Sequence, residues 1–370
     1  MKNELTALDL KFLVKELAVL KGGIIQKVYQ EGKRVRIMIY LPTQGERELF
    51  YEPNKIFITM YKRPAAEHPE AFGMLMRKHL TGQKIVDISQ HNFDRILEMR
   101  TERNYVIFEL FSKGNVILCD ENKKIIMPLE VQLWRDRKVV PHVDYIYPPP
   151  VLNPFEISEY DLKRILSATD KALVKFLASN LSLSGLYAEE VCLRAGIDKN
   201  KPCNVLTEEE IKKIISAMQS LISESKPRII ENTDVVPFEM KIYANSSQVL
   251  FETYNEALDT FFTKSEEEKF KTEVEAKAEE FKEKIERKLT EQRATLDKYK
   301  RLEAESRNAA EAIMRNLELV QNIISGIQNA RKNNISWEEL KERIKLEETS
   351  EAQAIKEIRE KDGVVVINIE

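Results

Sequence analysis

The sequence is poor in the residues from which metal sites, disulfides and nucleophilic centres are commonly built. Its 370 residues include three cysteines and four histidines. The cysteines (Cys119, Cys192 and Cys203) form neither a disulfide framework nor a CxxC pair. No histidine has a His, Cys or acidic partner at the spacing of a metal site. The composition therefore predicts no metal, no cofactor and no disulfide.

Long hydrophobic runs and catalytic signatures are also missing. No apolar segment approaches the roughly 18 residues of a membrane span, and Met1–Leu10 lacks the uninterrupted apolar region of a secretion signal. The phosphate loops GxGxxG and GxxxxGK[ST] and the nucleophile elbow GxSxG do not occur. We therefore predict a soluble cytoplasmic protein that binds no membrane and is not an enzyme.

Charge is abundant and unevenly distributed. Charged residues make up 32% of the chain, above the roughly 25% of an average soluble domain, which predicts a long solvated helix. Residues 1–150 carry 24 Lys and Arg against 19 Asp and Glu, a net +5, whereas the remainder carries 34 against 42, a net −8. A basic N-terminal region is typical of a domain that faces nucleic acid. Ordinary scatter explains an excess of this size equally well.

Residues 1–150 alternate short strand patterns with two helix patterns. Apolar residues at helical spacing predict helices over 3–20, ended by Gly22 and Gly23, and over about 69–81. Many short strands with few helices indicate an α+β sandwich or barrel. The predicted strands are Ile24–Tyr29, Val35–Leu41, Glu48–Tyr51, Ile56–Thr59, Ile85–Ser89, Ile96–Arg100, Tyr105–Leu110, Val116–Cys119 and Ile125–Met127.

The middle of the chain is predicted to be helical. Tyr147–Pro150 continues neither a strand nor a helix and indicates a linker. Residues 158–224 read as compact helices joined by glycine turns, a pattern compatible with a helix-hairpin-helix module, whose backbone amides bind phosphates, and equally with a plain helical spacer. Strand patterns follow at Phe238–Tyr243 and Gln248–Phe251.

The last third contains a long helical seam. From Val274 to Ile327, apolar positions recur in alternating steps of four and three, the pattern of a coiled coil. We expect this arm to end at Gly326 and Asn333, with a helix over Trp337–Ile358 and a strand without an obvious partner over 363–369. Because a coiled coil needs a second helix, either the chain forms a homodimer or it is an N-terminal fragment of a longer protein.

One polar cluster stands among the apolar strands. Asp94 and Arg95 lie between two predicted strands, and on extended backbone their side chains diverge and do not pair with each other. Such an Asp and Arg can bind a base edge and a phosphate, and a structural ion pair with some other residue is the competing interpretation. Asp9 interrupts the apolar stripe of the first helix and, taken alone, is an ordinary exposed acid.

A set of motifs extends over most of the chain. They are Phe72–Leu80, Ile88–Gln90, Phe93–Ile96, Glu109–Leu110, Lys113–Leu118, Phe251–Phe262 and Ser336–Leu340. Together they resemble the motifs of the NFACT family, in its archaeal RqcH/NEMF-type group of ribosome quality control factors, whose bacterial members are called fibronectin-binding protein A homologs.

The resemblance implies a fold and a role. Family members have an N-terminal domain similar to that of formamidopyrimidine-DNA glycosylases, followed by a helix-hairpin-helix domain and a long coiled-coil arm. They bind large ribosomal subunits that hold peptidyl-tRNA, recruit tRNA, and promote untemplated alanine tailing of the stalled chain, while the ribosome makes the peptide bonds. The resemblance assigns tRNA handling to Asp9, Asp94 and Arg95, which we expect to line one groove. We add Arg77 and Lys78 from the first motif as tRNA-binding residues.

The resemblance also sets segment boundaries. We expect the N-terminal domain at 1–150, the helix-hairpin-helix domain at 151–226, strands and a helix returning to the first domain at 227–262, the arm at 263–332 and a truncated middle segment at 333–370. Nothing after Gly363 resembles the family's second arm or its RNA-binding domain, so we expect an N-terminal fragment.

Two alternatives remain open. The glycosylases use an N-terminal proline nucleophile, whereas this chain starts Met1-Lys2-Asn3, which disfavours a nucleic-acid lyase or glycosylase. A non-catalytic adhesion or scaffold protein is the other alternative, and the missing secretion signal argues against it. The family's glycine in the turn before the linker is also missing from Pro141–Asp144.

Overall fold

The computed structural model describes residues 2–61, 63, 69–135, 137–231, 233–360 and 362–369, and the side chains within these ranges except those of 265–277. The chain divides into two compact units, Met1–Lys269 and Phe270–Glu370. Each unit is described by itself below.

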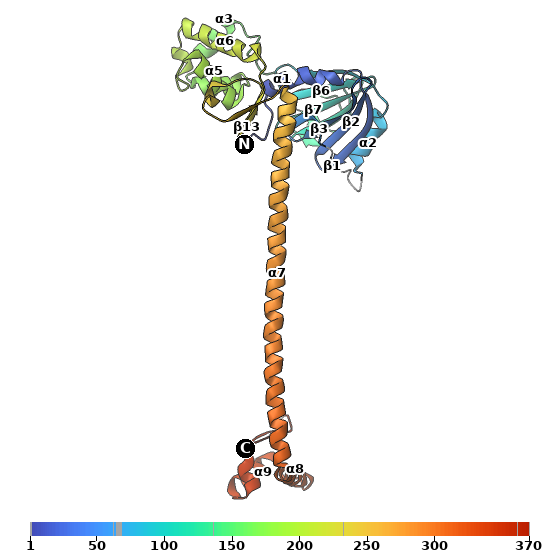
Figure 1. Ribbon diagram of the computed structural model, residues 1–370, viewed down its shortest axis with the longest axis vertical. Helices are drawn as coiled ribbons and strands as arrows, with labels where there is room; N and C mark the ends of the chain where they lie inside the picture. The colour runs from blue at the N-terminus through green and yellow to red at the C-terminus, as the bar shows by residue number, and fades with distance from the viewer. Residues whose placement is uncertain are drawn as a thin grey trace. The chain divides into compact units, whose positions relative to one another are not determined.

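Two antiparallel sheets form the N-terminal part of the first unit (Figure 1). In both sheets the strand order follows the chain order, because short turns join neighbouring antiparallel strands. All nine strands predicted in this region are confirmed. The first sheet contains β1 (Ile24–Glu31), β2 (Arg34–Leu41), β3 (Gly45–Glu52) and β4 (Lys55–Thr59), and the second β5 (Ile85–Gln90), β6 (Ile96–Thr101), β7 (Asn104–Glu109), β8 (Asn115–Asp120) and β9 (Ile125–Pro128).

The two sheets share one apolar core. They meet across Tyr51 of β3 and Phe108 of β7, whose ring centroids lie 5.6 Å apart, and they join at a corner through a bridge between Ile24 and Lys84. Gly114 is required here because its φ is +66° and a Cβ would stand 2.6 Å from the hydroxyl of Tyr51. The predicted sandwich or barrel-like domain therefore has a core that both sheets line.

Two helices complete this domain. α1 (Ala7–Leu17) starts four residues later than predicted because Thr6 caps it in a reciprocal capping box with Asp9. The leucines of α1 are buried in the shared core. α2 (Ala71–Leu80) packs against β1, where a Cβ on Gly73 would lie 2.9 Å from the Cβ of Gln30. This close approach explains why the Phe72–Leu80 motif has a glycine at position 73.

A two-stranded hairpin follows the second sheet and has no counterpart among the predicted strands. It consists of β10 (Gln132–Leu133) and β11 (Lys138–Val139). Each strand has only two residues, too few for a period-two pattern to be read from the sequence.

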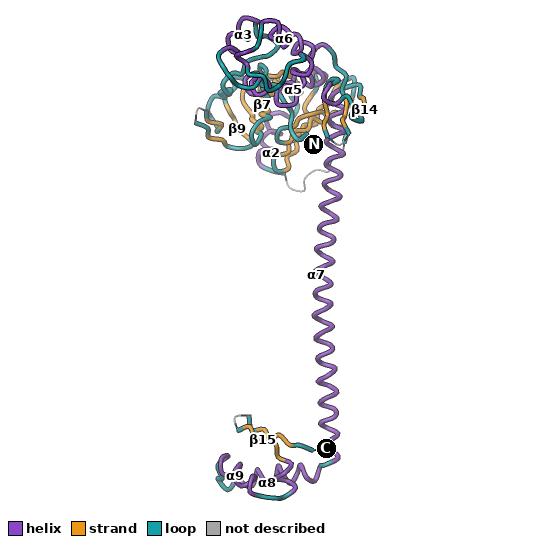
Figure 2. The backbone as a smooth tube through the Cα atoms, turned by 90° about the vertical axis from the view of Figure 1, so that its left-hand side faces the viewer, coloured by secondary structure: helices purple, strands orange, loops and turns teal. Residues whose placement is uncertain are grey.

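The rest of the first unit is helical, with one small sheet. Figure 2 shows these helices grouped apart from the strands of the two larger sheets. The small sheet has the order β13-β12-β14. Its elements and the helices before it are α3 (Glu159–Ser167), α4 (Leu173–Asn180), α5 (Ser184–Ala195), α6 (Glu208–Ser223), β12 (Arg228–Ile230), β13 (Asp234–Val236) and β14 (Gln248–Leu250).

The strand predicted over Phe238–Tyr243 is wrong. This segment contains a 3-10 turn, Lys241–Tyr243, instead. The buried carboxylate of Glu190 accepts hydrogen bonds from the backbone N–H groups of Lys241 and Ile242, at 2.9 and 3.1 Å. Those two donors are therefore used by a distant carboxylate and are not available to a sheet.

The second unit begins within α7 (Tyr254–Arg315) and continues through α8 (Leu317–Lys332), α9 (Trp337–Leu346) and α10 (Ser350–Ala354) to β15 (Ile355–Arg359) and β16 (Val364–Ile367). The break in the long helix lies at Asn316. Of the two places where we predicted the end of the arm, Gly326 lies inside α8, whereas Asn333 is the C-cap of α8. The predicted helix over Trp337–Ile358 is wrong in its last part, because residues 355–359 form a strand. That strand is the partner of the C-terminal strand, which the sequence left unpaired.

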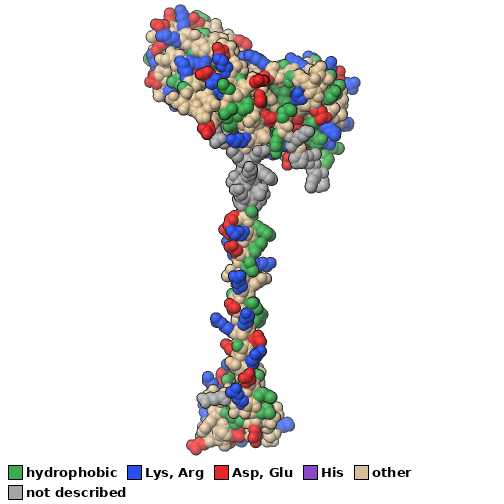
Figure 3. Space-filling view, in the orientation of Figure 1, with side chains coloured by type: hydrophobic (Ala, Val, Ile, Leu, Met, Phe, Trp, Pro, Cys, Tyr) green, Lys and Arg blue, Asp and Glu red, His purple; other side chains and the backbone are tan. Residues whose placement is uncertain are grey.

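The predicted seam is exposed on α7. Figure 3 shows apolar side chains spaced along the described part of this helix, between acidic and basic ones. Phe281, Ile285, Leu289, Leu296 and Tyr299 are each exposed by 45% or more. Val274, the first predicted seam residue, lies among the residues whose side chains are not described. Along the part of α7 whose side chains are described, the seam residues are therefore exposed, whereas the later seam residue Val320, on α8, is buried.

Candidate functional site

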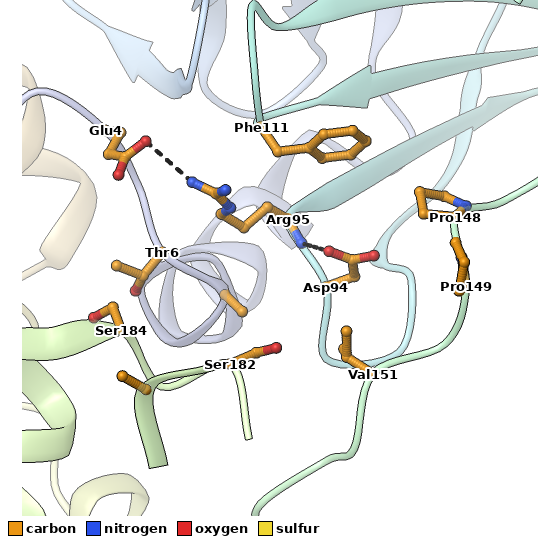
Figure 4. A pocket seen from close by; sticks show the side chains of 12 residues that line it. Glu4, Thr6, Asp94, Arg95, Phe111, Pro148, Pro149, Val151, Ser182 and Ser184 are labelled. Atoms are coloured by element: carbon orange, nitrogen blue, oxygen red, sulfur yellow. Dashed lines mark hydrogen bonds and ion pairs between the residues drawn. The ribbon is translucent and has the colours of Figure 1, made fainter. Parts of the chain in front are cut away.

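A groove of about 420 Å³ lies between the strand domain and the helical region of the first unit. Five segments line it: the residues at the start of α1, the loop before β6, the loop after β7, the proline linker, and the end of α4 with the turn into α5 (Figure 4). The lining residues are Glu4, Thr6, Ala7, Asp94, Arg95, Phe111, Pro148, Pro149, Val151, Ala178, Ser182 and Ser184.

Asp94 and Arg95 face this groove from one turn, and their side chains do not pair with each other. Asp94 accepts a 2.7 Å hydrogen bond on Oδ1 from the backbone N–H of Arg95. Arg95 donates to Glu4 at 3.1 Å, with the arginine side chain 31% and the glutamate side chain 50% exposed. The predicted ion pair of Arg95 with some other residue is thus present, and Arg95 also lines the groove, while its binding of a phosphate stays a prediction. An exposed pair of this kind is worth about 0–1 kcal/mol, so an incoming phosphate can displace Glu4.

The wall opposite Arg95 is the N-terminus of α5 (Figure 4). Ser182 and Ser184 both have positive φ, +52° and +63°. The cap residue Leu183 makes no side-chain hydrogen bond to the first turn. The hydroxyl oxygen of Ser184 is buried and has no partner among the described residues. A helix start with uncapped N–H groups attracts anions.

Asp9 does not line the groove, so the prediction that it shares one groove with Asp94 and Arg95 is wrong. Its side chain is 0% exposed, and the reading of it as an exposed helical acid is wrong for the same reason. One carboxylate oxygen accepts from Lys2 Nζ at 2.9 Å and from the hydroxyls of Tyr187 and Tyr254, both at 2.6 Å. The other accepts from the N–H and hydroxyl of Thr6, at 2.8 and 2.9 Å.

The Asp9 cluster, defined as Lys2, Thr6, Asp9, Tyr187 and Tyr254, joins α1, α5 and the start of α7. Burial raises the pKa of Asp9, but Lys2 and the two tyrosine hydroxyls outweigh it, and the pKa is below the usual 3.8. Burial and the nearby carboxylate raise the pKa of both tyrosines well above 10. Asp9 is therefore ionised inside the protein. It is connected to the groove through the hydrogen bonds that it accepts from Thr6, which lines the groove.

The start of α7 is fastened by the motif around Asn255. Glu16 of α1 accepts hydrogen bonds from the N–H groups of Tyr254 and Asn255, at 2.8 and 2.7 Å. The Asn255 amide accepts from Ile58 N–H at 2.7 Å and donates to its carbonyl at 2.8 Å, which completes the edge of β4. Asp259 accepts from Met60 N–H at 2.8 Å. These motif residues are structural.

Arg77 and Lys78 lie elsewhere, on α2, and the structure does not bring them to the groove. Arg77 donates to the carbonyl of Val28, and its guanidinium lies 5.2 Å from the ring centroid of Tyr29. Lys78 is exposed and has no ion-pair partner among the described residues. Two residues of the predicted set, Asp94 and Arg95, therefore share the groove.

Sequence reasoning missed most of the groove. Phe111, the two prolines and the two serines come from segments distant in the chain, and no spacing rule connects them. The sequence carried one signal for this part of the groove. Ser182–Gly185 has the composition of a tight turn, and a helix pattern follows it.

The described residues offer little covalent chemistry. No group of three His, Cys, Asp or Glu side chains among them could hold a metal ion. Burial raises the pKa of the Cys119 thiol to about 12 and that of Cys192 to about 11, which suppresses the nucleophilic thiolate. The amine of Lys2 is 7% exposed and bound to Asp9, so it is not presented to a substrate. Among the described residues, no helix combines the length and apolar composition of a membrane span.

Comparison with known proteins agrees with this fold. The chain is 32% identical over 395 residues to the archaeal Rqc2 homolog aRqcH of Methanocaldococcus jannaschii, covering 100% of this chain and 58% of that protein. It is 28% identical over 284 residues to the Rqc2 homolog RqcH of Bacillus subtilis, covering 69% of this chain and 48% of that one. The chain thus spans about half the length of these relatives.

Solved structures show the same fold over most of the first unit. The fibrinogen binding protein from Staphylococcus aureus matches with a TM-score of 0.59 at 23% identity, covering 70% of this chain and 98% of that one. The family model described as NFACT N-terminal and middle domains matches residues 6–356. The chain therefore belongs to the NFACT family.

Proposed function

We propose that this chain is the tRNA-binding part of a ribosome quality control factor. Relatives named as Rqc2 homologs and as ribosome quality control complex subunits support this role. The observation that carries the proposal is the groove, where Arg95, the start of α5 and Phe111 converge. On this proposal the partners are tRNA, in particular alanyl-tRNA, and the large ribosomal subunit that holds peptidyl-tRNA in the cytoplasm.

The groove has the chemistry of a site for one nucleotide of an RNA loop. The guanidinium of Arg95 and the N–H groups at the start of α5 supply phosphate donors on opposite walls. Phe111 offers a ring for stacking a base, and the second oxygen of the Asp94 carboxylate, unbonded within the described residues, can accept from a base amino group. The volume of about 420 Å³ is within the range of small-ligand sites.

We propose roles for the other predicted features as well. The helices α3–α6 would act as the helix-hairpin-helix module, and the seam of α7 would form a coiled coil with a second helix, either from a second copy of the chain or from a returning segment. Alanine tailing would be promoted by positioning tRNA, with the ribosome making the bonds. Asp9 would act by positioning Thr6 at the groove, and Arg77 and Lys78 would contribute peripheral phosphate contacts.

Fluorescence anisotropy with labelled tRNA over a salt series tests the proposal. We compare wild type with Arg95→Ala and Asp94→Ala, and use Lys345→Ala as a control that removes an exposed cation of the second unit. We expect Arg95→Ala to weaken tRNA binding about tenfold, or ~1.4 kcal/mol, and Lys345→Ala to leave it within about twofold, because an isolated exposed charge contributes little.

A length-matched unstructured RNA serves as the second ligand. A preference for tRNA that Arg95→Ala reduces supports recognition in the groove. Equal binding of both RNAs, unchanged by Arg95→Ala, would refute the groove as the recognition site.

A further inference from the structure

The hairpin formed by residues 131–139 exposes a tryptophan between apolar and basic side chains. Leu133 is 72% exposed, Val131 61% and Trp134 45%. Arg135 and Lys138 are exposed and have no ion-pair partner among the described residues. Asp136, the acid of this segment, lies outside the described residues. An exposed aromatic ring beside cations is a recurring feature of surfaces that bind nucleic acid.

The hairpin is held in place by a buried ion pair. Arg137 lies 2.5 Å from the carboxylate of Glu109, which is 1% exposed, and the hydroxyl of Tyr145 donates to the same carboxylate at 2.8 Å. Arg137 also donates to the carbonyl of Ile146 at 3.2 Å. Burying such a pair costs desolvation free energy and tolerates little displacement. The exposed tip is thus carried on a fixed base.

This base is continuous with the groove. The guanidinium of Arg137 lies 5.8 Å from the ring centroid of Phe111, and Phe111 lines the groove with Arg95. Phe111 therefore lies beside both the groove and the base of the hairpin.

We propose that Trp134, Arg135 and Lys138 of this hairpin form a second RNA contact, in which Trp134 stacks on an unpaired base and Arg135 and Lys138 bind the adjoining phosphates. This inference rests on the proposed function of the groove, and it adds an element that extends RNA binding beyond it. RNA is favoured over a protein partner because cores of protein interfaces are depleted of lysine, whereas stacking on an aromatic ring combined with phosphate contacts suits single-stranded RNA.

The two tryptophans of the chain allow a direct test. Trp337→Phe leaves Trp134 as the sole tryptophan of the full chain, and Trp337 lies in the second unit. We titrate this variant with tRNA and with a single-stranded oligoribonucleotide while recording tryptophan emission and, in parallel, anisotropy of the labelled RNA. We expect saturable quenching of Trp134 with the same midpoint as the anisotropy curve.

Two further variants separate stacking from charge. Trp134→Ala is expected to weaken RNA binding about tenfold and Trp134→Phe less, because base stacking on a ring contributes about 1–3 kcal/mol. Arg135→Ala with Lys138→Ala is expected to reduce the slope of log K against log salt by about 1.4, for two phosphates of a single strand. Leu133→Ser is the matched control, which removes exposed apolar surface and keeps the ring.

The outcomes distinguish the two proposals. Binding that depends on Arg95 without any change in Trp134 emission would overturn the hairpin contact and leave the groove intact. Quenching by ribosomal proteins and not by RNA would also overturn it. If labelled RNA does not bind to the chain at all, both proposals fail.

Discussion

Asp9 and Asp94 belong to the same domain, and the family resemblance marks both as functional, yet they are in opposite environments. The carboxylate of Asp9 is fully buried and accepts hydrogen bonds from four residues. Asp94 lies at the groove, and among the described residues its carboxylate accepts one hydrogen bond, from the backbone N–H of Arg95. Thr6 connects the two regions, since it lines the groove and donates to Asp9.

This difference shows that a residue of a family motif can matter for two physical reasons, the stability of the fold or the chemistry of a surface site. Removing Asp9 would leave the buried hydroxyl of Tyr187 without its acceptor, while Lys2 and Tyr254 would keep the carbonyl of Val235, so its effect on function would come through folding. Removing Asp94 or Arg95 would alter chemistry at a surface that solvent reaches. On the proposed function, variants at both positions are expected to weaken tRNA binding, and stability measurements distinguish the two causes.

The largest expected effect is on stability at Asp9. Asp9→Ala should lower the free energy of unfolding by about 3 kcal/mol, because it removes a buried carboxylate that accepts from Lys2, Thr6 and two tyrosines, while Lys2 keeps Asp234 at 3.7 Å as its remaining ion-pair partner. Asp94→Ala should change it by less than about 1 kcal/mol, because Asp94 is half-buried and its carboxylate accepts one hydrogen bond, from the backbone N–H of Arg95. Thermal and urea unfolding followed by circular dichroism compare the two. Equal Tm values for both variants would contradict the contrast drawn above.

A smaller effect is expected where α7 meets β4. Asn255→Ala should cost about 1–3 kcal/mol, because the N–H and carbonyl of Ile58 lose their side-chain partners. Hydrogen exchange at the Ile58 amide measures this directly, and its protection should fall. Asn322→Ala, on α8, is the matched control, since its amide bonds only to an exposed carboxylate. Unchanged protection at Ile58 would show that Asn255 does not close the strand edge.

The smallest effect is a pH dependence. The pKa of Asp9 is lower in the folded protein than its usual 3.8, with burial opposing the shift and Lys2 and the tyrosines outweighing burial. Its contribution to stability is therefore complete above about pH 3.8 and is lost as the pH falls through the folded pKa. We expect the Tm difference between wild type and Asp9→Asn to be constant near neutral pH and to shrink in acid. A Tm difference that grows in acid would show that the pKa of Asp9 is raised in the folded protein, and would contradict this prediction.

Glu16, on the same helix, sharpens this comparison. Burial raises its pKa above the usual 4.5, against the hydrogen bonds from Asn255 and Tyr254. Its contribution is therefore complete below about pH 4.5 and is lost as the pH rises through the folded pKa, opposite to Asp9. The Tm difference between wild type and Glu16→Gln should accordingly be largest below about pH 4.5 and should shrink as the pH rises.

Much of the fold was predictable from local pattern. Period-two runs located the nine strands of the two sheets, and glycines located most of their turns, because side-chain direction along a strand is set by the backbone itself. The predictions failed where a distant residue changed the outcome. Glu190 takes the donors of Lys241 and Ile242 and replaces a predicted strand with a turn. The local pattern of residues 355–359 predicts a helix, but in the structure these residues pair with β16 and form a strand.

The candidate site shows the same division. The sequence by itself determined family membership, the basic charge of residues 1–150, and the Asp94–Arg95 pair, because these are properties of composition and motif. Only the tertiary structure decided that Asp9 is buried, since its partners Tyr187 and Tyr254 lie 178 and 245 residues away along the chain. The groove likewise exists only where five distant segments meet. Burial depends on which segments meet, and no local periodicity encodes that.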